Sequence, residues 1–122
     1  MKRGFGNLVV WQEAKSLAID TYALCRQPPL GKEWSLRDQM QRAAISISSN
    51  IAEGYERSTA KDELRFLSIA KGSASELRSQ LLVVHGLGLI DKQTCESLAD
   101  RCHRVGSLLF KFMKHKEGLA ED

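Results

Sequence analysis

Two long segments in the second half of the chain carry apolar residues at alternating steps of three and four. One runs over residues 59–87 and the other over 91–116. Their apolar positions are Leu67, Ala70, Ala74, Leu77, Leu81 and Val84 in the first, and Cys95, Leu98, Cys102, Val105, Leu109 and Phe112 in the second. A helix turns once in about 3.6 residues, so this spacing places each set on one side of a helix. The pattern predicts two helices that bury an apolar seam in a bundle.

The ends of these two helices are marked by residues that start and stop helices. Thr59 is followed three residues later by Asp62, which is the spacing of a side-chain cap on the first turn. Gly86 and Gly88, on either side of Leu87, follow the first seam, and glycine readily adopts the left-handed conformation that ends many helices. We therefore expect one helix over 59–87 and another over 91–116, followed by a short polar tail.

Two further helical segments occupy the first half of the chain. Residues 7–27 show a helical apolar spacing that stops at Pro28 and Pro29. Residues 35–57 begin with Ser35, whose hydroxyl we expect to cap the helix. The connections between the four segments are short, which makes neighbouring helices antiparallel. The sequence therefore predicts an all-α fold, an up-down-up-down antiparallel four-helix bundle.

The composition is typical of a single globular domain over 1–122. The chain is 43% hydrophobic and 27% charged. No apolar run approaches the roughly 20 residues of a membrane span, and no signal-peptide pattern precedes the first helix. Three cysteines, Cys25, Cys95 and Cys102, lack the paired spacing of a zinc or redox site. We expect a cytoplasmic protein with reduced thiols and with no metal or cofactor.

The helix expected over 35–57 has three distinct sides when it is projected at about 100° per residue. The side that should face the core carries Leu36, Met40, Ala43, Ile47, Ile51 and Gly54. A polar stripe beside it consists of Arg42, Ser46, Asn50, Glu53 and Arg57. An outer side, opposite the core, carries Ile45, Ser48, Ser49 and Ala52. The small and apolar outer side predicts a contact with another subunit. For the polar stripe, a structural hydrogen-bond network is favoured over a ligand site.

The helix expected over 91–116 has a basic side. From residue 101 to 116 the chain carries five cations and no acid, although its net charge is only +3. The basic stripe consists of Arg101, Arg104, Lys111, Lys114 and His115. A solvated face is the simpler interpretation, because the helix dipole favours cations near a C-terminus. In an oligomer, however, several copies of the stripe could together follow a phosphate backbone. No zinc-finger or RNP-like motif predicts sequence-specific contacts.

Three stretches together resemble a known family. They are DQMQRAAISISSNIAEGYERS at 38–58, FLSIAKGSASEL at 66–77 and LGLI at 87–90. The chain resembles, over about 8–90, the four-helix-bundle proteins encoded in intervening sequences of bacterial 23S ribosomal RNA genes. The resemblance implies a cytosolic bundle, often a ring-like homopentamer, with no established enzymatic activity. The chain is also similar to the accessory variability protein of diversity-generating retroelements, which acts with a reverse transcriptase and its RNA.

Arg78 and His85 keep an enzymatic hypothesis open. Their seven-residue spacing places both on one face of a helix and resembles the ribonuclease motif of HEPN proteins. The chain departs from the intervening-sequence family at Arg78, where an acidic residue is usual, at Ser48, where proline is common, and at Glu56, where glycine is frequent. The ribonuclease motif is short, and we expect no enzymatic activity.

The sequence thus predicts a non-catalytic, self-assembling bundle that binds structured RNA or a nucleic-acid-handling enzyme through basic surfaces. The expected partners are further copies of the chain, as a pentamer by resemblance, together with RNA or a nucleic-acid-handling protein, and no membrane. A protein–protein interaction module without nucleic acid remains an alternative. A HEPN-like ribonuclease that uses Arg78 and His85 is another.

Overall fold

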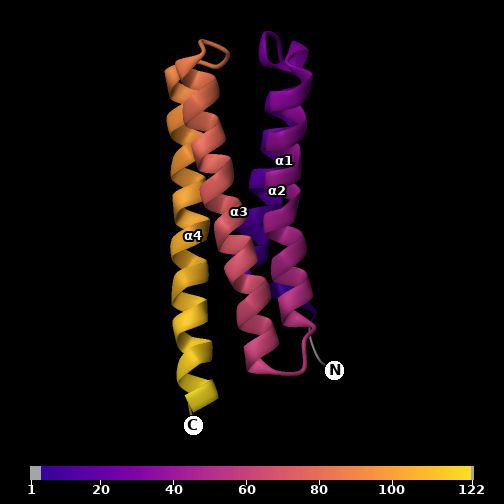
Figure 1. Ribbon diagram of the computed structural model, residues 1–122, viewed down its shortest axis with the longest axis vertical. Helices are drawn as coiled ribbons and strands as arrows, with labels where there is room; N and C mark the ends of the chain where they lie inside the picture. The colour runs from indigo at the N-terminus through magenta and orange to yellow at the C-terminus, as the bar shows by residue number, and fades with distance from the viewer. Residues whose placement is uncertain (1–3, 122) are drawn as a thin grey trace.

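Four long helices form an all-α bundle, which confirms the predicted fold class. The computed structural model describes residues 4–121. The helices are α1 (Val9–Cys25), α2 (Trp34–Tyr55), α3 (Ala60–Gly86) and α4 (Lys92–Glu121), and two short 3-10 helices are η1 (Phe5–Asn7) and η2 (Leu30–Lys32). The described range contains no strand. Figure 1 shows that successive helices run in opposite directions along the bundle. Within residues 4–121, no helix has both the length and the apolarity to cross a membrane.

The core is built largely from the two predicted seams. All six seam residues of α3 are buried, and so are five of the six on α4. The sixth, Phe112, is half-buried and packs against the core. Leu17 of α1 and Met40 and Ile47 of α2 are fully buried in the same core. Each helix packs against its neighbour in the chain, and α1 also packs against α4, which closes the bundle.

Two helices start as the sequence predicts. Thr59 Oγ1 accepts a hydrogen bond from the Asp62 N–H at 3.2 Å, so Thr59 caps α3. Asp91 Oδ1 accepts one from the Thr94 N–H at 2.7 Å at the start of α4. That bond lowers the pKa of the Asp91 carboxyl, because it stabilises the charged form. Between these helices Gly88 has a φ of 77°, in the left-handed region that favours glycine.

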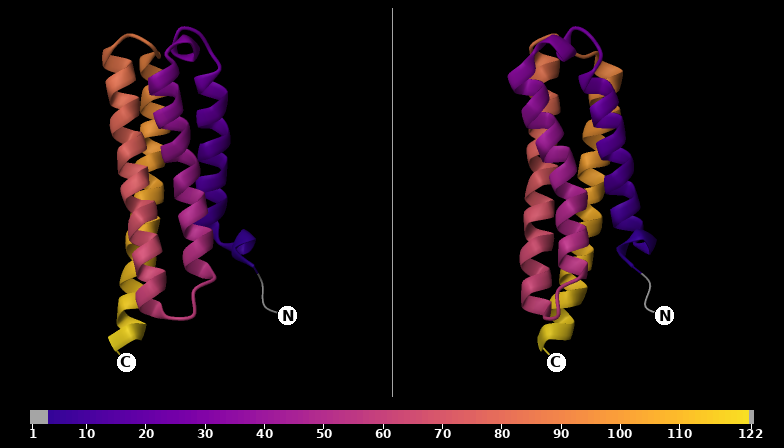
Figure 2. Two further views of the ribbon diagram at one scale, coloured as in Figure 1. Left: turned by 45° about the vertical axis from the view of Figure 1, so that its right-hand side comes forward. Right: turned by 90° about the vertical axis from the view of Figure 1, so that its right-hand side faces the viewer.

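The two predictions about the start of α2 and the end of α4 are wrong. Helix α2 begins at Trp34, and its N-cap residue Glu33 makes no side-chain cap. The preceding 3-10 helix η2 leads almost directly into α2, so Ser35 lies inside the helix and accepts a hydrogen bond from Gln39 Nε2 at 3.4 Å. Helix α4 continues to Glu121, where a polar tail was expected. Figure 2 shows this end of α4 extending beyond the connection between α2 and α3.

The backbones of α2 and α3 approach closely at Gly54. This glycine is buried, and a Cβ atom there would lie 3.2 Å from the Glu63 carbonyl oxygen and 3.2 Å from Phe66 Cβ. Gly72 of α3 has open space around its Cα, with no atom within 4 Å of such a Cβ. The missing side chain at Gly54 therefore serves the packing of α2 against α3 near their connection.

Candidate functional site

The middle of the polar stripe lies in the contact between α2 and α3. Asn50 Nδ2 donates to the Ser46 carbonyl oxygen at 2.8 Å and to Ser46 Oγ at 2.9 Å. Ser73 Oγ of α3 donates to the same Ser46 Oγ at 3.0 Å. Ser46 and Asn50 are both half-buried. These bonds satisfy polar groups that face the neighbouring helix, so this part of the stripe is a structural network.

The two ends of the polar stripe face solvent. Glu53 and Arg57, four residues apart, form an ion pair on the surface of α2. The Arg57 guanidinium carbon also lies 4.7 Å from the centroid of the Phe66 ring. Arg42 is exposed, and it makes no hydrogen bond or ion pair within the described residues. The five residues of the stripe therefore have different surroundings and do not converge on one site.

The outer side of α2 is narrower than the helical projection predicts. Ile45 is 47% exposed, Ser49 is exposed and Ala52 is half-buried. Ser48, which was placed opposite the core, is buried, and its Oγ donates to the Ile45 carbonyl oxygen at 3.2 Å. That placement is wrong because α2 packs against both α1 and α3, so its buried arc extends further around the helix than a single seam.

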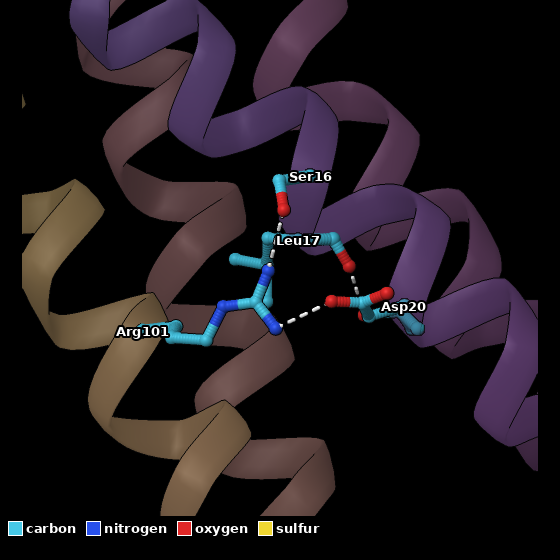
Figure 3. A network of polar contacts seen from close by, with 5 residues as sticks. Ser16, Leu17, Asp20 and Arg101 are labelled. Atoms are coloured by element: carbon cyan, nitrogen blue, oxygen red, sulfur yellow. Dashed lines mark hydrogen bonds and ion pairs between the residues drawn. The ribbon is translucent and has the colours of Figure 1, made fainter.

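Two arginines of the basic stripe form ion pairs with acids of α1. Arg101 Nη1 lies 2.7 Å from Asp20 Oδ2, and its Nη2 donates to Ser16 Oγ at 3.0 Å (Figure 3). Arg104 Nη2 lies 3.1 Å from Glu13 Oε1. Both acids belong to α1, so the two ion pairs join α4 to α1. The side of α4 that faces α1 is therefore largely neutralised.

The rest of the basic stripe lies further along α4. Lys114 Nζ is 3.3 Å from Glu117 Oε2, in an exposed pair within the helix. Lys111 and His115 are exposed, and neither has an ion pair or hydrogen bond within residues 4–121. The stripe thus divides into residues whose charge is paired and residues whose charge is available.

The last lysine of α4 has a structural role. Lys116 Nζ lies 3.3 Å from Oε1 of Glu63, whose side chain is only 11% exposed. Lys116 also lies 5.4 Å from the centroid of the Phe112 ring. The ion pair joins the end of α4 to the first turn of α3. Because Glu63 is mostly buried, its negative charge would be uncompensated without Lys116.

A cationic groove, which no pattern within a single helix predicts, lies between the outer faces of α3 and α4. Its volume is ≈ 360 Å³. Its basic residues are Lys71, Arg78, His103 and Lys111, and its hydroxyl groups belong to Ser75 and Ser107. None of the groove-lining residues is acidic, and within the described chain none of the four basic residues forms an ion pair. We call this feature the α3–α4 groove.

The α3–α4 groove follows from helical spacing on two separate helices. Lys71, Ser75 and Arg78 recur at steps of four and three on α3, so they share one face. His103, Ser107 and the pair at 110–111 do the same on α4. The pattern in each helix is visible in the sequence, but only the packing of α3 against α4 brings the two faces together.

Cys102 lies at the base of the α3–α4 groove. Burial raises the pKa of its thiol to about 12, and the positive charges of Arg101 and Arg78 oppose that rise. The thiol is therefore protonated at neutral pH and is not a nucleophile. Burial also raises the pKa of Cys25 to about 11 and that of Cys95. Residues 4–121 hold no group of three side chains suited to a metal ion.

The proposed ribonuclease residues do not meet in the groove. Arg78 lines it, but His85 does not and is exposed in the last turn of α3. Seven residues correspond to about 10.5 Å along a helix, so the two side chains start from positions well separated along α3. Arg78 instead lines the same groove as Lys111, a residue of the basic stripe, because α3 packs against α4.

Comparisons with known proteins find a matching family model and a solved structure of similar fold. The model of the family described as 23S rRNA-intervening sequence protein matches residues 6–111. A crystal structure of a protein of unknown function from the S23 ribosomal protein family of Bacteroides thetaiotaomicron is similar, with a TM-score of 0.81. That protein is 24% identical, and the match covers 87% of this chain and 99% of the other. No curated protein shows a significant match.

Proposed function

We propose, for a chain that belongs to the 23S rRNA-intervening sequence protein family, a role as a non-catalytic accessory protein that binds structured RNA. The observation that supports this role is the α3–α4 groove, whose four basic side chains have no acidic partner among the described residues. Phosphate groups supply the charge that such a surface lacks, and lysine and arginine bind them without regard to sequence.

Self-association strengthens this proposed binding. Ile45 on α2 and Ile69 and Val83 on α3 are 47%, 44% and 52% exposed, and such apolar side chains are suited to a contact with another copy. A ring-like pentamer, which the family resemblance implies, would present five grooves to one RNA. Several weak sites on one assembly bind a long strand far more tightly than one site does.

Binding to a structured RNA hairpin across a salt series tests the proposed function. The affinity should fall steeply as salt rises, because each protein–phosphate contact releases a counterion. Native mass spectrometry of the same samples would give the number of chains and RNA molecules per complex. Absence of binding at about 50 mM salt would refute RNA binding, since non-specific electrostatic contacts are strongest at low salt. An oligomer without RNA would then favour the protein–protein interaction module.

The integrity of the bound RNA tests the non-catalytic part of the proposal. We expect the hairpin to remain intact during long incubation with the wild-type chain. Cleavage that disappears in the His85→Ala variant would instead establish the HEPN-like ribonuclease. Arg42→Ala is the matched control, because Arg42 is exposed and lies on α2, outside the lining of the groove.

A further inference from the structure

The α3–α4 groove combines cations, hydroxyl groups and an exposed aromatic ring. We infer that it holds one unpaired nucleotide of a single RNA strand, with the base against the Phe110 ring and the flanking phosphates against Lys71, Arg78 and Lys111. This inference rests on the proposed function and names the kind of RNA element that the groove takes. It goes beyond a general attraction of phosphates to a basic surface, because it assigns a place to a base.

Phe110 supplies the surface for the base. It belongs to the lining of the groove and is 50% exposed. Removal of a phenyl ring from water is favourable, so a ligand that covers this ring is stabilised. Lys114 Nζ lies 5.4 Å from its ring centroid, so a cation adjoins the aromatic ring. A half-exposed aromatic ring among cations is the arrangement on which single-stranded nucleic acids stack, and every base has a face that can use it.

The cations are placed to hold the strand on both sides of that base. Lys71 and Arg78 come from α3 and Lys111 comes from α4, so positive charge lines both walls of the groove. Arg78 lines the groove together with Cys102 of α4, and its positive charge opposes the rise in the pKa of that thiol. The Ser75 and Ser107 hydroxyls can donate hydrogen bonds to phosphate or ribose oxygens. Paired acids, which neutralise the opposite side of α4, are missing from this lining.

The size of the groove favours one nucleotide over a duplex. Its volume of ≈ 360 Å³ lies near the lower end of the range for small-ligand pockets, about 300–1,000 Å³. In a duplex both faces of each base are covered by its neighbours, so a base can reach Phe110 only when it is unpaired. Hairpin loops, bulges and single-stranded ends provide such bases. Discrimination between bases is not expected, because stacking is tolerant of sequence.

Binding of an unstructured, fluorescently labelled uridine oligonucleotide of about 12 nucleotides tests this assignment by anisotropy. Phe110→Ala should weaken binding by roughly 5- to 150-fold, as expected for loss of one stacked base. Trp34→Ala is the matched control, since Trp34 is an aromatic residue, 68% exposed, on α2, and should change affinity less than about twofold. Because both side chains are exposed, circular dichroism should show both variants folded.

The salt dependence and a crosslink provide two independent readouts. Arg78→Gln combined with Lys111→Gln should reduce the salt slope by about 1.4, since each phosphate contact on a single strand contributes about 0.7. Arg42→Gln, an exposed arginine without a partner in the described chain, should leave the slope unchanged. Oligonucleotides that carry 4-thiouridine should crosslink to the peptide that contains Phe110.

The other outcomes distinguish failure of the nucleotide assignment from failure of the proposed RNA binding. If the hairpin and the oligonucleotide bind equally well to Phe110→Ala and wild type, the nucleotide assignment is wrong while RNA binding stands. A crosslink confined to other peptides has the same meaning. If uridine monophosphate competes at the same concentration as the oligonucleotide, the occupant is a free nucleotide and the strand assignment is wrong. If neither RNA binds at about 50 mM salt, the proposed function itself fails.

Discussion

The two sides of α4 carry similar numbers of basic residues, but acids of a neighbouring helix pair with those on one side only. On the side toward α1, Arg101 and Arg104 are held by acids at 2.7 and 3.1 Å. On the side toward α3, His103 and Lys111 line the α3–α4 groove together with Lys71 and Arg78, and none of the four has an acidic partner within the described residues. The difference shows that the charge available to a ligand depends on the neighbouring helices and not on the helix that carries the cations.

Charge reversal in the groove should produce the largest difference between the two sides. Arg78→Glu combined with Lys111→Glu should weaken hairpin binding by roughly 30-fold or more at low salt, because two phosphate contacts are replaced by repulsion. Arg101→Gln combined with Arg104→Gln should change the affinity by less than about threefold, since those charges are already paired. Fluorescence anisotropy measures both. Equal losses would remove the distinction between the two sides.

Two lysines of α4, one paired with an acid and one unpaired in the described chain, should contribute differently to the free energy of unfolding. Lys116→Met should lower the free energy of unfolding by about 1–3 kcal/mol, because Glu63 would be left mostly buried without its partner. Lys111→Met should change it by less than about 0.5 kcal/mol, since Lys111 is exposed and unpaired in the described chain. Urea denaturation distinguishes them. Adding Glu63→Gln to Lys116→Met should recover part of the loss, and no recovery would argue against the ion pair.

Burial of Cys102, which raises the pKa of its thiol, should make the free energy of unfolding dependent on alkaline pH. Its folded pKa, about 12, lies above the ordinary value of 9.0, so the unfolded chain loses the proton first. The stabilisation is present below pH 9 and declines as the pH rises toward 12, by at most about 1.4 kcal/mol per pH unit. Urea denaturation at several pH values should show a shallower decline for Cys102→Ala than for wild type. Parallel curves would contradict the shift.

Loss of the ion pair between Arg101 and Asp20 should have the smallest effect on stability. Arg101→Gln should lower the free energy of unfolding by about 0.5–1 kcal/mol, because the ion pair with Asp20 is partly exposed. Arg78→Gln should have no measurable effect on stability, since no ion pair is lost within residues 4–121. A double-mutant cycle with Asp20→Asn isolates the interaction between Arg101 and Asp20. A coupling energy of zero would mean that the pair does not hold α1 against α4.

The sequence predicts what depends on a single helix and fails where two helices must be placed together. The seam around Leu77 on α3 and the Thr59 cap follow from local spacing, and both are present. Neutralisation of Arg101 by Asp20 joins residues 81 positions apart, and the predicted antiparallel order does not set the rotation of each helix about its axis, which decides which side chains face each other. The α3–α4 groove was missed for the same reason. Ser48 was misplaced because a projection with one buried side ignores the second neighbour of α2.

Gly54 has a consequence for the connection between α2 and α3. The tight backbone contact with Glu63 fixes the relative position of the two helices just before the chain turns. The turn before the Thr59 cap, residues 56–58, is exposed and does not have to set that position. This makes it a natural site for inserting an epitope or a fluorescent peptide, because loop closure becomes only slightly less favourable as a loop grows longer. The same glycine that brings the helices together therefore leaves their linker free to vary in length.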